Sequence, residues 1–176
     1  VQDSLSDGSD LVMFSGDKLF GSVQSGMTAG NEGLVKEIKN FSLFRTYRCS
    51  PITLFELQET AVKYLNKKEK EIPFWNLITE PYSSLEERCK IIAKSISFST
   101  TIEKGKSVIG GGTLPSVTLE SPILLIEYEK TGNIINQLIK NDIPIVPRII
   151  KDRVCLDLRS VFNDQDATIV QALNNT

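Results

Sequence analysis

The pattern of apolar residues changes near residue 83, and this change constrains the fold more than any other feature of the 176-residue sequence. Up to residue 82, one short strand–turn–strand segment is followed by apolar residues at the three- and four-residue spacing of amphipathic helices. Beyond it, short apolar runs of strand length alternate with helical segments. The sequence therefore predicts two parts, residues 1–82 and residues 83–176. The second is expected to be a compact α+β domain with helices packed on an antiparallel sheet.

The first part begins with two short apolar runs, at residues 10–14 and 27–29, separated by a polar turn and several glycines. Strand, polar turn and strand are typical of a loop that holds a reactive side chain at a sheet edge. Asn31 predicts the start of a helix over residues 32–39, and Ser50 before Pro51 predicts the start of a long helix that ends near residues 67–71. Its expected apolar face consists of Leu54, Leu57, Ala61, Tyr64 and Leu65.

The second part begins with a capping-box pattern at residues 83–86, which predicts a helix over 85–96. A turn at residues 151–153 between two apolar runs predicts a hairpin. Strands are expected at 97–103, 106–109, 123–128, 145–150 and 154–158, and helices near 133–140 and 165–173.

The chain contains no histidine, and this absence narrows its chemistry. Ser–His and Cys–His catalytic pairs are excluded within this polypeptide, as is most zinc chemistry, so acid–base work must fall to Lys, Asp, Glu, Tyr or Cys. The cysteines Cys49, Cys89 and Cys155 have no close spacing, which argues against a disulfide framework and a metal site and favours a cytoplasmic protein. Cys89 and Cys155 are expected in the core, and Cys49 is expected to be an inert thiol.

Charge and hydropathy exclude further classes of protein. A net charge of −2, with 24% charged and 40% hydrophobic residues, indicates neither a disordered chain nor a basic nucleic-acid platform. The apolar runs are strand-sized, so no membrane span is expected. The first ten residues are polar and acidic, unlike a secretory signal peptide.

Lys18 is the candidate catalytic residue, because it lies in a polar turn directly after an apolar run, between Gly16 and Gly21. A lysine that forms an imine must be partly deprotonated, which burial and nearby positive charge favour. Ser15 could donate its hydroxyl to an anion such as a cofactor phosphate. On spacing alone, a turn of this kind is more often a solvated surface loop.

The wider segment, DLVMFSGDKLFGSVQSGMTAG at residues 10–30, resembles the cofactor-lysine segment of bacterial selenocysteine synthases, which runs approximately DLV-x-FSGDKL-x-GG-P-Q-x-G-x-x-x-G. The resemblance implies that Lys18 carries pyridoxal 5′-phosphate and that Ser15 helps to bind it. The sequence departs from the pattern at Ser22 and Val23, where the family has Gly-Pro in the loop beside the cofactor.

The resemblance continues at residues 44–49, FRTYRC, where the family has a segment like RALRVDK. It implies that Arg45 and Arg48 bind substrate, and two guanidinium groups three residues apart can converge on one oxyanion. Capping of the neighbouring helices is the alternative role for these two arginines. Ser50 and Pro51 depart from the Asp-Lys of the family.

Two later segments resemble the same family. Residues 109–121, IGGGTLPSVTLES, are expected to form a tight loop to which we assign no chemistry. Residues 143–161, IPIVPRIIKDRVCLDLRSV, match the terminal pattern of the family. There the resemblance implies that Arg148 contacts substrate, whereas Arg159 is expected to be structural, pairing with Asp157 or a helix end.

Taken over the whole chain, the resemblance implies the C-terminal part of a fold type I pyridoxal-phosphate transferase, comprising the end of a large α/β domain and a small α+β domain. Its expected activity is the conversion of seryl-tRNA(Sec) to selenocysteinyl-tRNA(Sec) with selenophosphate, in a homo-oligomer. The chain is expected to be a fragment that is inactive alone. Two alternatives stay open: another enzyme of this fold, such as a β-eliminating lyase acting on a free amino acid, and a truncated, non-catalytic folding or assembly module.

Overall fold

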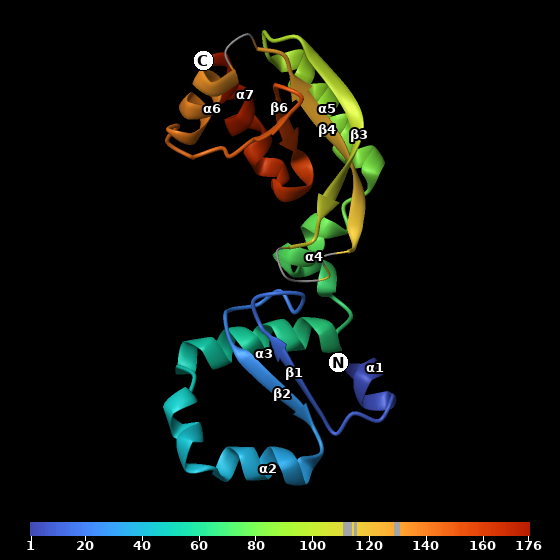
Figure 1. Cartoon of the computed structure of the whole chain (residues 1–176), viewed down its shortest axis with the longest axis vertical. Coiled ribbons are helices and arrows are strands. Elements are labelled where there is room, and N and C mark those ends of the chain that lie inside the picture. Colours follow the sequence, from blue (N-terminus) through green and yellow to red (C-terminus); the bar gives the residue numbers. More distant parts are fainter. Residues whose placement is uncertain (111–113, 115, 129–130) are drawn as a thin grey trace. The chain divides into compact units, whose positions relative to one another are not determined.

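The structure is a computed structural model that describes residues 1–110, 114, 116–128 and 131–176 (Figure 1). The chain forms two compact units, Val1–Asn76 and Leu77–Thr176. Their boundary follows Asn76, whereas the apolar pattern of the sequence changes near residue 83. The functional role of each part remains a prediction.

The first unit is a β-hairpin accompanied by helices. Strands β1 (Leu11–Ser15) and β2 (Gly26–Gly30) pair antiparallel, with Leu11 opposite Gly30 and Ser15 opposite Gly26, so the predicted strand–turn–strand segment is confirmed. The helical elements are α1 (Gln2–Ser6), α2 (Glu32–Asn40), the 3-10 helices η1 (Ser42–Tyr47) and η2 (Glu69–Glu71), α3 (Pro51–Leu65) and α4 (Pro73–Ile78), which contains the boundary.

Side-chain caps fix the starts of α2 and α3 where the sequence predicted them. The Asn31 side-chain oxygen accepts hydrogen bonds from the backbone N–H groups of Gly33 (2.9 Å) and Leu34 (3.3 Å). The Ser50 hydroxyl oxygen accepts one from Thr53 N–H at 3.2 Å. These bonds satisfy N–H groups that lack a partner within the helix, which confirms both predicted starts.

The first unit buries little of its apolar surface. The large hydrophobic side chain that is buried in this unit is that of Ile72, which is 1% exposed. The expected apolar face of α3 is covered only in part, because Leu57, Ala61 and Tyr64 are half-buried whereas Leu54 and Leu65 are exposed. The large hydrophobic side chains exposed along α2, η1 and α3 are Ile38, Phe41, Leu43, Phe44, Tyr47, Ile52, Leu54, Phe55, Val62 and Leu65.

The second unit is built on a four-stranded sheet in which every neighbouring pair is antiparallel, as predicted. The strand order is β3 (Thr100–Val108), β4 (Thr118–Ile126), β6 (Arg153–Asp157) and β5 (Arg148–Ile150). The helical elements of this unit are α5 (Tyr82–Ser95), α6 (Thr131–Ile139), α7 (Asp166–Asn174), η3 (Leu158–Ser160) and η4 (Asn163–Gln165).

The main core of the second unit lies between the sheet and its helices. Leu124 and Ile126 of β4 belong to this core together with Leu85, Cys89 and Ile92 of α5, all of them 0% exposed. Side chains alternate along a strand, so Ile123 and Leu125 point to the other face of β4. There they form a second, smaller cluster with Cys155. Cys89 and Cys155 are thus free, buried thiols, as predicted, and burial raises the pKa of Cys89 to about 12.

Several boundaries differ from the sequence prediction. The predicted capping box is wrong, because α5 begins at Tyr82 after Pro81, and the Ser84 hydroxyl donates instead to the Glu80 carboxylate. The two strands expected at 97–103 and 106–109 form the single strand β3. It continues through Gly105, where a Cβ would lie 2.2 Å from Ile123 Cγ1, so the missing side chain makes room for Ile123.

Other differences concern element type and extent. Strand β4 begins at Thr118, before the expected residue 123, and β5 keeps only the last three residues of the run expected at 145–150. The helical elements α1, η1 and α4 were not predicted. Of the loop expected at 109–121, Gly111, Gly112, Thr113 and Pro115 lie outside the described residues.

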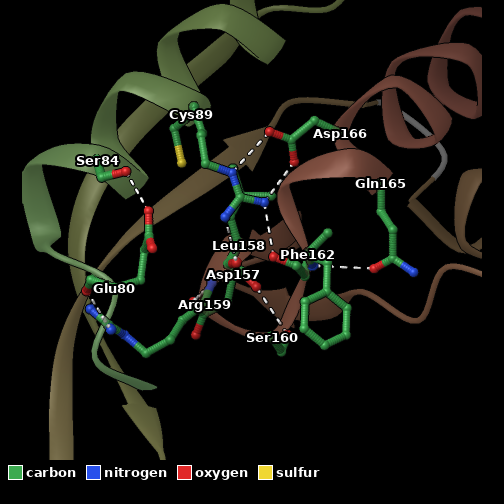
Figure 2. Close-up of polar contacts among 12 residues, drawn as sticks. Glu80, Ser84, Cys89, Asp157, Leu158, Arg159, Ser160, Phe162, Gln165 and Asp166 are labelled. Atoms are coloured by element: carbon green, nitrogen blue, oxygen red, sulfur yellow. Dashed lines mark hydrogen bonds and ion pairs between the residues drawn. The ribbon is translucent and has the colours of Figure 1, made fainter. Parts of the chain in front are cut away.

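Arg88 of α5 ties this helix to α7 through Asp166, the residue labelled at the start of α7 in Figure 2. Its Nε and Nη2 donate to the two carboxylate oxygens of Asp166 at 2.9 and 2.7 Å, and Nη2 also donates to the Val161 carbonyl at 2.9 Å. The side chains of Arg88 and Asp166 are only 10% and 22% exposed. The guanidinium is therefore held by a bidentate carboxylate in a mostly dry setting.

Arg159 has a structural position, as predicted (Figure 2). Its Nη1 donates to the carbonyls of Ile78 and Glu80 at 3.1 and 2.9 Å, and its Nη2 donates to the Glu120 carbonyl at 2.8 Å. Its backbone N–H donates to the Asp157 carboxylate at 3.2 Å. Arg159 thus joins the end of α4 to β4.

Among the residues that the structure describes, no helix combines the length and the apolar character needed to cross a bilayer.

The Arg88–Asp166 contact predicts a clear effect on stability. Asp166→Ala leaves a mostly buried guanidinium without its carboxylate and should lower the free energy of unfolding of the second unit by about 2–3 kcal/mol. Urea unfolding followed by circular dichroism measures this loss. Glu86→Ala, which removes the exposed Glu86–Lys90 pair on the same helix, is the control and should cost much less. Equal losses in the two variants would contradict the assigned importance of Arg88.

Candidate functional site

Lys18 lies in the loop of the β1–β2 hairpin, and this loop is closed by its own backbone. Gly16 N–H donates to the Ser25 carbonyl at 2.9 Å, and Ser22 N–H donates to the Gly16 carbonyl at 2.8 Å. Within the loop, Gly21 N–H donates to the Lys18 carbonyl at 2.8 Å. Backbone hydrogen bonds therefore hold the chain at Gly16, two residues before Lys18, and at the Lys18 carbonyl, although the Lys18 side chain is exposed.

Gly16 is buried at a point where the structure has no room for a side chain. A Cβ there would lie 2.2 Å from Ser25 Oγ, 2.4 Å from the Val23 carbonyl oxygen and 3.1 Å from Leu57 Cδ2 of α3. The two shortest contacts are with another part of the same loop, and the third is with the helix against which the loop lies. Glycine at this position therefore lets the loop fold tightly and approach α3.

Two side chains of α3 hold the segment that follows Lys18. The Tyr64 hydroxyl donates to the Phe20 carbonyl at 2.9 Å and lies 3.3 Å from the Leu19 carbonyl. The Thr60 hydroxyl donates to Ser22 Oγ at 2.9 Å. Neither contact was predicted from the sequence, because helical spacing places Tyr64 on the apolar face of α3 and indicates no role for Thr60.

Aromatic rings surround the Tyr64 contact. The ring of Phe20 stacks on Tyr64, with centroids 5.2 Å apart, and meets Phe14 edge to face at 6.2 Å. The indole N–H of Trp75 donates to the Tyr64 oxygen. Burial raises the pKa of Tyr64 above its usual value, so this hydroxyl keeps its proton and remains a donor at neutral pH.

Ser15 and Lys18 lie three residues apart at one end of the hairpin. Ser15 is the last residue of β1 and is half-buried opposite Gly26. Lys18 follows two residues into the loop, and among the described residues its side chain makes no hydrogen bond or ion pair. The Lys18 side chain is exposed.

Arg45 and Arg48 lie at the corner between α2 and α3. Arg45 belongs to η1, Arg48 directly follows it, and both are exposed. Within the described residues, neither guanidinium makes a hydrogen bond or ion pair. The backbone N–H of Arg48 donates to the Arg45 carbonyl at 3.4 Å and so caps η1, but the capping does not involve either guanidinium. Both groups keep all their N–H donors available.

Arg148 lies in the second unit, at the start of β5, and it is partly neutralised. Its Nη2 donates to Asp157 Oδ2 at 3.1 Å, with the Arg148 side chain 48% exposed. The hydroxyls of Ser107 and Ser121 also donate to the Asp157 carboxylate, at 2.5 and 2.8 Å. Asp157 is thus held by two serine hydroxyls, and it in turn holds an arginine whose side chain is half exposed.

Comparison with known proteins gives a family match over most of the chain. A family model described as L-seryl-tRNA selenium transferase matches residues 1–162. Curated relatives named L-seryl-tRNA(Sec) selenium transferase include those of Clostridium perfringens, 34% identical over 98% of this chain, and Campylobacter jejuni, 32% identical over 94%. The chain spans only 39% and 37% of the length of these two relatives.

A solved structure supports the fold. "Structure of D-Glucosaminate-6-phosphate Ammonia-lyase" aligns with 97% of this chain and 44% of that chain, at a TM-score of 0.65. The two sequences are only 17% identical, so this likeness shows the fold alone.

The close contacts at Gly16 predict that a single methyl group disrupts the loop. Gly16→Ala should lower the free energy of unfolding of the first unit by about 1–3 kcal/mol, because backbone as well as side-chain atoms must move. Denaturation followed by fluorescence of Trp75, the one tryptophan in the chain, measures this loss.

Gly26→Ala is the matched control, since a Cβ at Gly26 meets nothing within 4 Å. It should be nearly neutral. A Gly16→Ala variant as stable as Gly26→Ala would show that the loop is looser than its contacts indicate.

Proposed function

The chain belongs to the L-seryl-tRNA selenium transferase family, and on that premise we propose that it is the lysine-bearing part of an enzyme that uses pyridoxal 5′-phosphate to convert seryl-tRNA(Sec) to selenocysteinyl-tRNA(Sec). The observation that carries the proposal is the Lys18 loop. An exposed primary amine sits on a backbone closed by hydrogen bonds of Gly16 and Gly21. That arrangement suits a lysine that must present its amine in one direction.

The residues present fit the cofactor. Pyridoxal phosphate supplies an aldehyde that a lysine amine can hold and an electron sink for chemistry at an amino acid α-carbon. Lys18 makes no competing hydrogen bond or ion pair with the residues described, and the half-buried Ser15 offers a hydroxyl donor for a phosphate oxygen. In our proposal Lys18 would hold the cofactor, and its amine would also be the base that takes the proton from the α-carbon of the seryl group.

The arginines supply the proposed anion contacts. Arg45 and Arg48 bind the phosphate-like selenium donor, selenophosphate, because guanidinium groups recognise such oxyanions with paired hydrogen bonds. The exposure of both groups and their lack of partners within the described residues support this role. Arg148 contacts the substrate with the N–H groups that Asp157 leaves available.

We further propose that the chain alone has no complete pocket. The apolar side chains exposed along α2, η1 and α3 form the kind of surface that other polypeptide normally covers. The relatives are more than twice as long as the segment they share with this chain. Polypeptide equivalent to their remaining length would cover this surface, and the completed enzyme would work as a cytoplasmic homo-oligomer on charged tRNA.

Chemical trapping tests the role of Lys18. The chain is joined to the remaining segment of the Clostridium perfringens relative, loaded with pyridoxal phosphate and reduced with borohydride, and the modified lysines are mapped by mass spectrometry. We expect modification at Lys18 well above that at Lys36 and Lys39 of α2, and its loss in Lys18→Ala. The unjoined chain should show no such preference. Uniform modification of all lysines in a folded joined protein would refute the proposal.

Kinetics of the joined protein test the arginines. Arg45→Ala and Arg48→Ala should each raise the KM for selenophosphate by about ten- to a hundredfold, the loss of one charge-assisted contact, while the trapping at Lys18 is retained. Lys39→Ala, which removes a nearby positive charge on α2, is the control and should change KM little. An unchanged KM in both arginine variants would remove them from the donor site.

A further inference from the structure

Helix α3 contacts the segment after Lys18 at two points one helical turn apart. Tyr64 reaches the backbone of Phe20, and Thr60 reaches the side chain of Ser22. Residues four apart lie on the same face of a helix, so α3 presents both hydroxyls to the loop side by side. The loop is thereby attached on the side where it returns towards β2.

The Tyr64 contact is fixed in orientation as well as in distance. Its hydroxyl donates to the Phe20 carbonyl, its oxygen accepts from the Trp75 indole, and its ring stacks on the Phe20 ring. With donor, acceptor and ring face all engaged, this side chain has little freedom left. It therefore holds the peptide of Phe20, two residues after Lys18, at a fixed place against α3.

The Thr60 contact is shielded from water. Thr60 is 9% exposed, and its hydroxyl lies 2.9 Å from both Ser22 Oγ and the Glu56 carbonyl oxygen. The Ser22 hydroxyl in turn donates to the same Glu56 carbonyl at 3.3 Å. The Ser22 N–H also donates to the Gly16 carbonyl. Thr60 is therefore linked through Ser22 to Gly16, on the other side of the Lys18 turn.

We propose that Thr60 and Tyr64 are positioning residues for Lys18: they hold its loop against α3 so that the amine projects in one direction. The inference rests on the proposed role of Lys18 as the cofactor lysine. Neither residue touches the reacting atoms, and their effect passes through the backbone of residues 19–22.

Amide hydrogen exchange of the full 176-residue chain, measured residue by residue by NMR, tests the loop contact without any cofactor. Thr60→Val keeps the shape and removes the hydroxyl, and Tyr64→Phe does the same for tyrosine. Each should speed exchange at Gly21 and Ser22 by about fivefold, the effect of one lost hydrogen bond on a local opening. Exchange in the paired residues of β1 and β2 should be unchanged.

Two controls separate positioning from general stabilisation. Thr60→Ser restores the hydroxyl and should restore slow exchange at Gly21 and Ser22. Tyr47→Phe removes a hydroxyl from a tyrosine that is 78% exposed and should have no effect. Unchanged exchange in Thr60→Val and Tyr64→Phe, or an equal rise throughout β1, β2 and α3, would overturn the inference.

Trapping in the joined protein links the loop to Lys18. Borohydride-trapped pyridoxal phosphate at Lys18, relative to Lys36 and Lys39, should fall severalfold in Thr60→Val and Tyr64→Phe and recover in Thr60→Ser. Faster exchange with undiminished trapping would show that the contacts order the loop without positioning the lysine, and would overturn the inference. No preference for Lys18 in the unsubstituted joined protein, with exchange behaving as expected, would refute the cofactor role and leave the loop contact standing.

Discussion

The Lys18 loop depends on the absence of a side chain at Gly16. The N–H and carbonyl of Gly16 bond Ser25 and Ser22, so both ends of the loop meet at this residue. A methyl group there would overlap the Val23 carbonyl and press on Leu57 of α3. Because the loop can fold tightly and still approach α3, the hydroxyls of Thr60 and Tyr64 reach the segment after the lysine. Without that approach, the Lys18 loop would have only its own backbone hydrogen bonds and no contact with Thr60 or Tyr64.

Local sequence signals predicted the elements that local chemistry determines. Asn31 and Ser50 mark helix starts because their side chains bond N–H groups within the next three residues, and the glycine-spaced turn marks the hairpin. The roles of Tyr64 and Thr60 could not be predicted in this way. Helical spacing shows on which face Tyr64 lies, but its hydroxyl partners are backbone carbonyls more than forty residues earlier in the chain. Periodicity carries no information about such a contact.

The departure at Ser22 and Val23 has a physical counterpart in the structure. A proline in the family pattern restricts the backbone of the loop directly, since its ring fixes φ. This chain has no such restraint at Val23. Its Ser22 instead brings a hydroxyl that Thr60 and the Glu56 carbonyl engage. In this chain, hydrogen bonds with a neighbouring helix restrain the loop at Ser22.

The two units are stabilised by different kinds of interaction. The second unit has a continuous apolar core between its sheet and helices, reinforced by Arg88 and Arg159. The first leaves large apolar side chains along α2, η1 and α3 in water, so burial contributes less to its stability. Its loop is held by backbone bonds and by the hydroxyls of α3, none of which requires further polypeptide. In our proposal, additional chain packed on the apolar surface would supply the walls of the pocket around Lys18, while contacts within this unit hold the backbone of the loop.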